Sequence, residues 1–217
     1  LGDTEVICGV KIQPDRPFPD TGDKGLLICT AELLPLSHPT VETGPPQPPV
    51  IELARVTDRG IRESHMIDVS QLVIEKDKSV IGVFADNVVV DYDGNLFDAC
   101  SYAATMALLS SKTPTWNWVD EKPVLAEGEE TQLPIMTIPV SVTMAKIGNH
   151  IVVDPNGDEW ACMDARVTIT SDSDGNICAL QKGGSDGFTL DEIVKCGETS
   201  VKVGAQIREK LKAAQQG

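Results

Sequence analysis

Three arginines in one short segment of this 217-residue chain could bind an anion. Arg55, Arg59 and Arg62 are spaced four and then three residues apart, so a helix would place them all on one face. Guanidinium groups suit phosphate contacts, and this positive charge is retained in a strongly acidic chain. The other interpretation is a solvated stripe of ion pairs along the helix, formed with Glu52, Asp58 and Glu63. Spacing alone leaves both interpretations open.

A second candidate is a turn between a predicted strand and a predicted helix. Residues 88–90 are three valines, which favour a buried strand, and the segment D-Y-D-G-N at 91–95 favours a turn. The apolar, alanine-rich segment that begins at Leu96 predicts a buried helix. Free backbone N–H groups at the start of such a helix form a natural anion site. The side chains that line this turn therefore decide whether the chain is an enzyme.

A pair of carboxylates is the third candidate. Asp158 and Asp164 lie six residues apart, which is not one face of a helix, so they would converge only across a turn or a helix end. We favour solvated or helix-capping acids, and acid chemistry or a metal bound at this pair remains the alternative.

Composition excludes several classes of function. With 18 basic and 33 acidic residues, the net charge of −15 argues against whole-surface attachment to nucleic acid or to an anionic membrane. A local basic patch could still bind RNA. No apolar run is long enough to span a membrane.

Cysteine and histidine spacing offers no ligand pattern. The six cysteines form no C-x-x-C pair and the three histidines lie far apart, so we predict no metal site and no cofactor. Buried free thiols are typical of a reducing compartment, which favours a cytoplasmic protein. The chain begins at Leu1, directly before a strand-like run, so we expect a natural N-terminal portion to be missing.

The elements that must position these residues follow from local pattern. Strands are predicted at 5–12 and 25–34, paired with each other, and at 71–75 and 79–90. The arginine-bearing helix is predicted at 50–64, with Leu53, Ala54, Thr57, Gly60 and Ile61 on its buried face. The helix that begins at Leu96 should end near 110–111, and residues 112–133 are predicted to be a loop.

The second half is expected to be smaller and rich in strands. We predict strands at 138–147 and 150–153, a short helix at 158–164, a hairpin of 166–170 with 176–180, and a loop at 181–185. A last helix should start at Thr189, capped with Glu192. The order predicts an α+β (α/β-like) chain of two related units, with mixed sheets packed against helices, divided as 1–112, a linker at 113–134, and 135–217.

Five segments in order resemble one family over essentially the whole chain. They are E-L-A-R-V-T-D-R-G-I-R-E-S, D-Y-D-G-N-L-F-D-A, S-V-T-M-A-K-I-G, M-D-A-R-V-T-I-T and A-L-Q-K-G-G. Together they resemble RNase PH-like subunits of the archaeal exosome, and within that family the second, non-catalytic ring subunit. The resemblance implies two RNase PH-type folding units in one chain. It also implies a hexameric ring, a trimer of heterodimers with a catalytic RNase PH-like subunit, which shortens single-stranded RNA by phosphorolysis from the 3′ end beneath cap RNA-binding subunits.

The resemblance also assigns roles to the three candidate sites. Catalytic relatives place a hydroxyl residue and an arginine where this chain has Leu96 and Phe97. A phosphate dianion seated beside those apolar side chains would be desolvated without charge-assisted partners. We therefore expect no catalytic residues in this chain.

Two of the arginines match residues expected to bind RNA phosphates. Arg55 and Arg59 correspond to those positions, and Arg62 joins them unless it pairs with an acid. Asp158 and Asp164 keep a D-x5-D spacing similar to the catalytic pair of RNase PH. A self-sufficient phosphorolytic or metal-dependent 3′ exoribonuclease that uses these two aspartates therefore stays as the alternative function.

Overall fold

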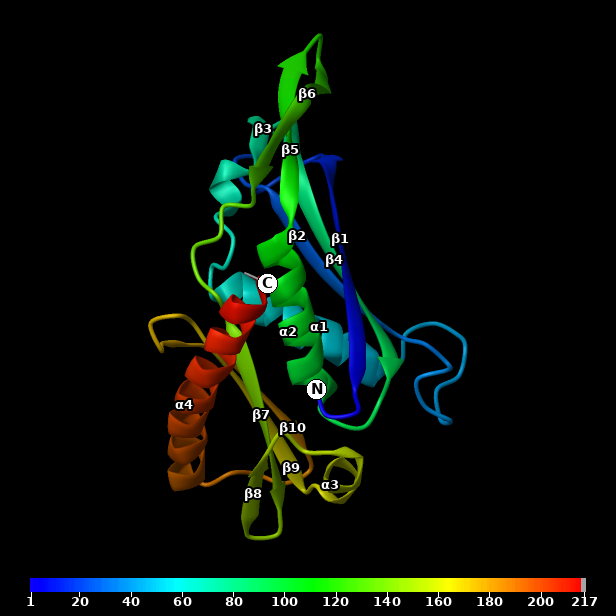
Figure 1. Cartoon of the computed structure of the whole chain (residues 1–217), viewed down its shortest axis with the longest axis vertical. Coiled ribbons are helices and arrows are strands. Elements are labelled where there is room, and N and C mark those ends of the chain that lie inside the picture. The colour runs from blue at the N-terminus through cyan, green and yellow to red at the C-terminus, as the bar shows by residue number, and fades with distance from the viewer. Residues whose placement is uncertain (216–217) are drawn as a thin grey trace.

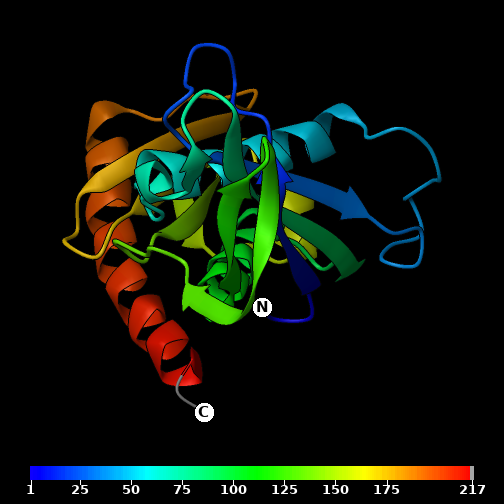
Figure 2. The same cartoon turned by 90° about the horizontal axis from the view of Figure 1, so that it is seen from above.

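The computed structural model describes residues 1–215, apart from the side chains of residues 127 and 129. Two four-stranded sheets lie end to end along the long axis of the molecule, and a helix between them contacts both (Figure 1). Seen from above, the longest helix lies along one side of the molecule and a long loop projects from the other (Figure 2). No helix within residues 1–215 is both long and apolar enough to cross a membrane.

The first sheet has the order β1-β4-β2, with a short β3 paired to β4. The strands are β1 (Glu5–Asp15), β2 (Leu26–Leu33), β3 (Val73–Glu75) and β4 (Ser79–Asp91), with the 3-10 turn Val69–Gln71 before β3. β4 runs antiparallel to β1 and parallel to β2. The predicted pairing of the first two strands was therefore wrong. The valine-rich β4 is buried along most of its length, so the two earlier strands flank it instead of each other.

The second sheet is antiparallel throughout, in the order β10-β9-β7-β8. Its strands are β7 (Val140–Ile147), β8 (His150–Val153), β9 (Ala165–Ser171) and β10 (Ile177–Gly184). β10 continues through most of the predicted loop at 181–185, which was therefore misassigned. The short α3 (Gly157–Cys162) precedes β9, and α4 (Leu190–Gln215) ends the described chain. The predicted capping box of α4 is confirmed, because Thr189 and Glu192 bond each other's backbone N–H groups.

The helix between the sheets is α2 (Leu96–Ser110). Its Ala104 and Leu108 pack against the first sheet. On the other side, the hydroxyl of Ser101 donates to that of Ser141 on β7 at 3.0 Å. β7 alternates apolar and polar residues as predicted, yet both of its faces are buried. Its apolar face packs on α4, and its hydroxyl face meets α2.

Residues 112–133 form a hairpin, not the predicted loop. β5 (Lys112–Val119) and β6 (Lys122–Gln132) pair antiparallel and project from the end of the molecule (Figure 1). The two residues between the strands, Asp120 and Glu121, both have positive φ, 48° and 59°. That is the backbone of a tight two-residue hairpin turn, for which Asn-Gly is the usual sequence. Asp120-Glu121 contains neither asparagine nor glycine, so the residue types give no sign of this turn.

Candidate nucleic-acid interface

The arginines lie on α1 (Pro48–Glu63), which packs against β2 and α2. Prolines at its first positions fit the helix start, because the first turn has no intrahelical use for their missing N–H groups. The buried face is Leu53, Val56, Thr57, Gly60 and Ile61. Four of the five predicted residues are confirmed; Ala54 is only half-buried, and Val56, which was not predicted, is buried. Arg55, Arg59 and Arg62 are all exposed, on the side away from this core.

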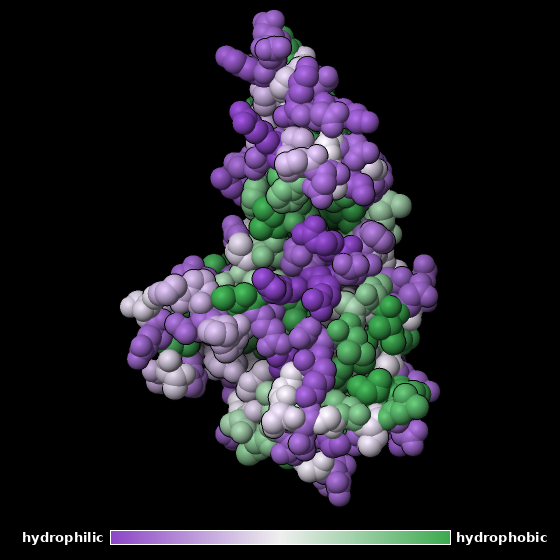
Figure 3. Space-filling model, turned by 180° about the vertical axis from the view of Figure 1, so that it is seen from behind, coloured by the Kyte–Doolittle hydropathy of each residue, from purple (hydrophilic) through white to green (hydrophobic). Residues whose placement is uncertain are grey.

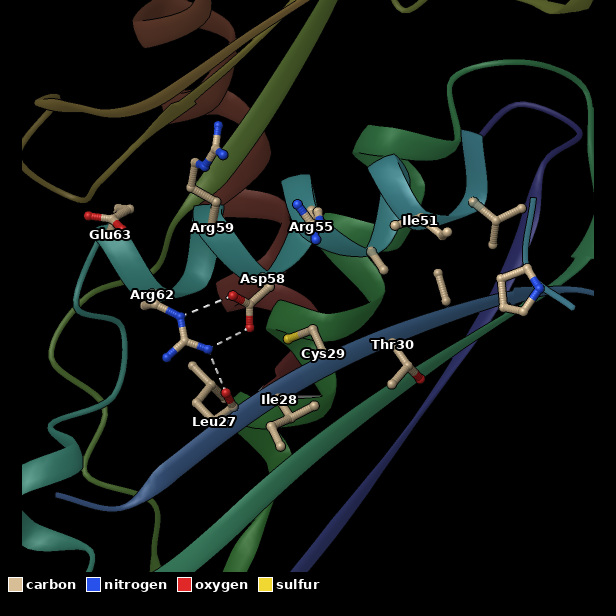
Figure 4. A pocket seen from close by; sticks show the side chains of 14 residues that line it. Leu27, Ile28, Cys29, Thr30, Ile51, Arg55, Asp58, Arg59, Arg62 and Glu63 are labelled. Atoms are coloured by element: carbon tan, nitrogen blue, oxygen red, sulfur yellow. Dashed lines mark hydrogen bonds and ion pairs between the residues drawn. The ribbon is translucent and has the colours of Figure 1, made fainter. Parts of the chain in front are cut away.

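The groove beside these arginines runs between α1 and the edge strand β2. It has a volume of about 560 Å³, with an apolar floor from residues 27–31 of β2 and arginines on its α1 side (Figure 4). The face of the molecule that carries α1 has a hydrophilic band across its middle with apolar patches beside it (Figure 3).

Arg62 is engaged with the protein. Its Nε and Nη2 donate to the two carboxylate oxygens of Asp58 at 3.0 and 2.9 Å, and Nη2 also donates to the carbonyl of Leu27 at 2.6 Å (Figure 4). The hydrogen bond with Asp58 raises the pKa of Arg62 above its ordinary value. A bidentate pair of this kind neutralises the guanidinium group, so Arg62 is the least available of the three for an outside anion.

Arg59 and Arg55 are held differently. Arg59 Nη1 donates to the amide oxygen of Gln181 on β10 at 3.0 Å, and this partner carries no charge. Among the residues the structure describes, no hydrogen bond or ion pair engages Arg55 (Figure 4). The face therefore presents two guanidinium groups without a neutralising carboxylate and a third that is paired.

The start of α2, the second candidate, is buried. Leu96 and Phe97 are 9% and 5% exposed, and Asn95 before them is 2% exposed with φ at 38°. Gly94 pairs with Asn156 so closely that a Cβ there would lie 2.5 Å from the Asn156 carbonyl carbon. The turn at residue 156 packs against the helix end, and the cavity of about 150 Å³ beside it is lined mainly by apolar and aromatic side chains, among them Leu96 and Phe97.

An arginine from the second sheet lies over this helix end. Arg166 on β9 is 4% exposed, and its guanidinium carbon lies 4.1 Å from the centre of the Phe97 ring. Trp160 of α3 stacks on Phe97 with ring centres 5.9 Å apart. Arg166 Nη2 pairs with Glu52 of α1 at 2.6 Å. A Cβ on Gly183 would lie 2.5 Å from the guanidinium carbon, so a larger residue there would displace the Arg166 side chain. Arg166 is therefore held by packing and by Glu52, while its buried Nη1 has no hydrogen-bond partner among the described residues.

One carboxylate is buried in the first turn of α2. Asp98 is 2% exposed and accepts hydrogen bonds from the backbone N–H and hydroxyl of Thr143 and from the amide of Asn95. Burial raises the pKa of Asp98 to about 7, against the lowering effect of those donors. The Asn95 amide also donates to Asp154 at 2.6 Å. This cluster joins α2 to the second sheet, with Asp98 and Asn95 buried and Asp154 at the surface.

Asp158 and Asp164 have different surroundings. Asp158 is exposed in the first turn of α3, whereas Asp164 accepts from the backbone N–H of Gly148 in the β7–β8 turn at 2.7 Å. Neither aspartate bonds the other or a common partner within the described part of the chain. The same residues contain no group of three or more His, Cys, Asp or Glu side chains that could hold a metal ion.

Three residues that contact this face were not predicted from the sequence: Glu52 as the partner of Arg166, Arg166 itself, and Gln181. The available signals were weak. Arg166 is the one charged residue in the buried strand 165–171, and Gln181 lies in A-L-Q-K-G-G, one of the segments that carry the family resemblance. Their roles depend on tertiary pairing across more than 100 residues.

Two family models match the chain. The 3′ exoribonuclease family, domain 1, matches residues 1–114, and domain 2 of the same family matches residues 137–203. A protein named exosome complex component Rrp42 from Thermoplasma volcanium is 48% identical over 210 residues, 97% of this chain and 78% of the relative. The protein of that name from Thermococcus kodakarensis is 47% identical over 212 residues, with the same shares of each chain.

Solved structures agree with these sequence matches. The Archaeoglobus fulgidus exosome with RNA bound to the active site contains a chain that is 45% identical, with a TM-score of 0.89 over 97% of this chain and 80% of that one. A chain in an archaeal exosome core is 42% identical, with a TM-score of 0.84 over 98% of this chain and 78% of that one.

Proposed function

The chain belongs to the 3′ exoribonuclease family, and from that premise we propose that it is the non-catalytic, RNA-binding ring subunit of an archaeal exosome. Its partners would be a catalytic RNase PH-like subunit, with which it forms a hexameric ring as a trimer of dimers, and cap RNA-binding subunits. The substrate of the assembly would be single-stranded RNA, degraded from the 3′ end by phosphorolysis in the cytoplasm. The division of the chain at residues 112 and 135 also stays a prediction.

The observation that carries the RNA-binding role is the pair of uncompensated guanidinium groups on α1. Arg55 and Arg59 are exposed, and no carboxylate bonds either of them among the described residues. Guanidinium groups bind phosphate oxygens without reading base edges, which suits an enzyme complex that must accept any sequence. Arg62 contributes less in this proposal, because Asp58 already neutralises it.

The burial of the α2 start supports a non-catalytic role. Phosphorolysis needs inorganic phosphate as the nucleophile, and phosphate needs donors that can reach it. Here Leu96 and Phe97 are buried, the turn at residue 156 packs against the helix end, and Arg166 is already paired with Glu52. The alternative of an independent nuclease gains no support from Asp158 and Asp164, which have separate partners.

Arg55→Ala/Arg59→Ala is expected to weaken RNA binding by the assembled ring about 100-fold, if each charge-assisted contact contributes about 1.4 kcal/mol. Loss of two phosphate contacts should also reduce the slope of log Kd against log salt by about 1.4. Fluorescence anisotropy with a labelled single-stranded RNA at several salt concentrations measures both quantities. Lys202→Ala/Lys210→Ala, which removes the same charge from exposed positions on α4, is the matched control. Unchanged affinity and slope in the arginine variant would remove the RNA-binding proposal.

Purified alone, the chain is expected neither to shorten RNA in the presence of phosphate nor to extend it from nucleoside diphosphates. Mixed with the catalytic RNase PH-like subunit, it should form a ring that does both. Gel assays of a labelled RNA, with mass measured by light scattering, check the two statements together. Phosphate- or metal-dependent activity of the chain alone that is lost in Asp164→Asn would instead support the independent nuclease.

A further inference from the structure

Gln181 on β10 bridges two charged residues of α1. Its amide oxygen accepts from Arg59 Nη1 at 3.0 Å, and its amide nitrogen donates to a carboxylate oxygen of Glu52 at 3.2 Å. A glutamine has one acceptor end and one donor end. With a guanidinium donor on one side and a carboxylate acceptor on the other, only one orientation of the amide satisfies both neighbours.

Glu52 is itself held in place. Its other carboxylate oxygen pairs with Arg166 at 2.6 Å, and Arg166 lies buried against Phe97. A continuous series of contacts therefore connects the packed start of α2 to the exposed Arg59. Because the side chain of a free arginine loses considerable rotamer entropy when it is fixed, an arginine oriented before RNA arrives binds at lower cost.

The side chain that orients each arginine decides how much of the guanidinium charge remains available to an outside anion. Asp58 orients Arg62 with a carboxylate and cancels its charge, whereas Gln181 orients Arg59 with a neutral amide. The negative charge that anchors the amide lies on Glu52, which bonds Arg166 and Gln181. Arg59 is thus fixed without being neutralised, the combination that a phosphate contact requires.

We propose that Gln181 is a positioning residue for RNA, because it orients the Arg59 guanidinium from the second sheet and leaves its charge free for a phosphate. This inference rests on the proposed RNA-binding role of Arg59. It gives the second half of the chain a part in an interface whose proposed RNA-binding arginines, Arg55 and Arg59, lie on the first half.

The test compares two replacements in the assembled ring at a pH well above the ordinary carboxylate pKa. In Gln181→Glu, one carboxylate oxygen meets Arg59, and the other replaces the amide donor that faces the Glu52 carboxylate. The new charge cancels that of Arg59 and the contact with Glu52 is lost, so RNA affinity should fall about tenfold and the salt slope by about 0.7, as in Arg59→Ala. In Gln181→Ala the charge stays but its orientation is lost. Affinity should then fall about threefold with the slope unchanged. Gln132→Glu, at an exposed position on β6, controls for the added negative charge.

The same replacements in an Arg59→Ala background separate positioning from a general effect on folding. There, Gln181→Ala and Gln181→Glu should change RNA affinity by less than about twofold, because the residue they act through is gone. The inference is overturned if Gln181→Glu binds like the unmodified ring, or if its loss persists undiminished without Arg59. If Arg59→Ala itself leaves binding unchanged, the proposed function fails first, and thermal melting of each ring shows which variants fold.

Discussion

Asp98→Asn is expected to remove a large pH dependence from the stability of the chain. The pKa of Asp98 is raised to about 7 in the folded state by burial, whereas an unfolded aspartate has a pKa of about 3.9. The folded state therefore holds a proton that the unfolded state has released. The contribution of Asp98 to the free energy of unfolding is fully present below about pH 4. It is lost as the pH rises from there to about 7, by about 1.4 kcal/mol per pH unit and about 4 kcal/mol in total.

Asparagine is a close substitute for the protonated carboxyl. Its oxygen can accept from the Thr143 N–H and the Asn95 amide, and its NH₂ can donate to the Thr143 hydroxyl, which can donate in turn to Thr168. The second N–H of the new amide has no acceptor among these partners, so the variant should be somewhat less stable than the unmodified chain near pH 4. It should exceed the stability of the unmodified chain near pH 8, where the buried carboxylate is charged.

Urea unfolding of both chains at a series of pH values measures this difference directly. Asp120→Asn, in the exposed β5–β6 turn, serves as the control for loss of one carboxylate, and asparagine also tolerates the positive φ there. Parallel stability curves for the Asp98→Asn and unmodified chains would show that the carboxyl does not titrate in this window.

Arg166→Ala is expected to lower the free energy of unfolding by about 3–5 kcal/mol, as when one partner of a buried ion pair is removed. Three losses combine: the ion pair with Glu52, the stacking on Phe97, and the volume between that ring and Gly183. Chemical denaturation monitored by the fluorescence of Trp160 and the other tryptophans measures the effect.

Two further variants separate these losses. Arg166→Met restores volume and a contact between sulfur and the aromatic rings, so it should recover part of the stability. Arg16→Ala, in the exposed loop between β1 and β2, removes the same charge and should change stability by less than about 0.5 kcal/mol. A cost below about 1 kcal/mol for Arg166→Ala would show that this contact is not a structural one.

The local residue pattern predicted which segments form helices and strands better than it predicted which strands pair with each other. The face of α1 could be derived from sequence because 3.6-residue spacing separates its apolar residues from its arginines. Strand pairing could not, because β1 and β2 have suitable compositions for each other and only the burial of β4 between them decides the order. The hairpin at 112–132 was missed because Asp120-Glu121 lacks the glycine that usually marks a turn with positive φ.

In the candidate site, too, local features were predictable from the sequence and long-range contacts were not. The apolar residues at the start of α2 were evident from sequence, and so was the possibility that Arg62 pairs with an acid. The contacts of Arg166 and Gln181 were not, because they join β9 and β10 to α1 across more than 100 residues, and no local spacing encodes such a contact.

The pairing of Arg62 with Asp58 has a consequence for how a polyanion reaches the chain. With one of three arginines cancelled and a net charge of −15, unbalanced positive charge on α1 is confined to two neighbouring side chains. Repulsion by the acidic remainder of the surface extends over about one Debye length, about 8 Å at physiological salt. An RNA that approaches another face of the molecule is therefore repelled. Added salt then has opposite effects on the encounter rate, since it weakens the attraction at α1 and also lowers the barrier elsewhere. The acidic surface therefore favours encounters in which a nucleic acid approaches the α1 face over encounters at other faces.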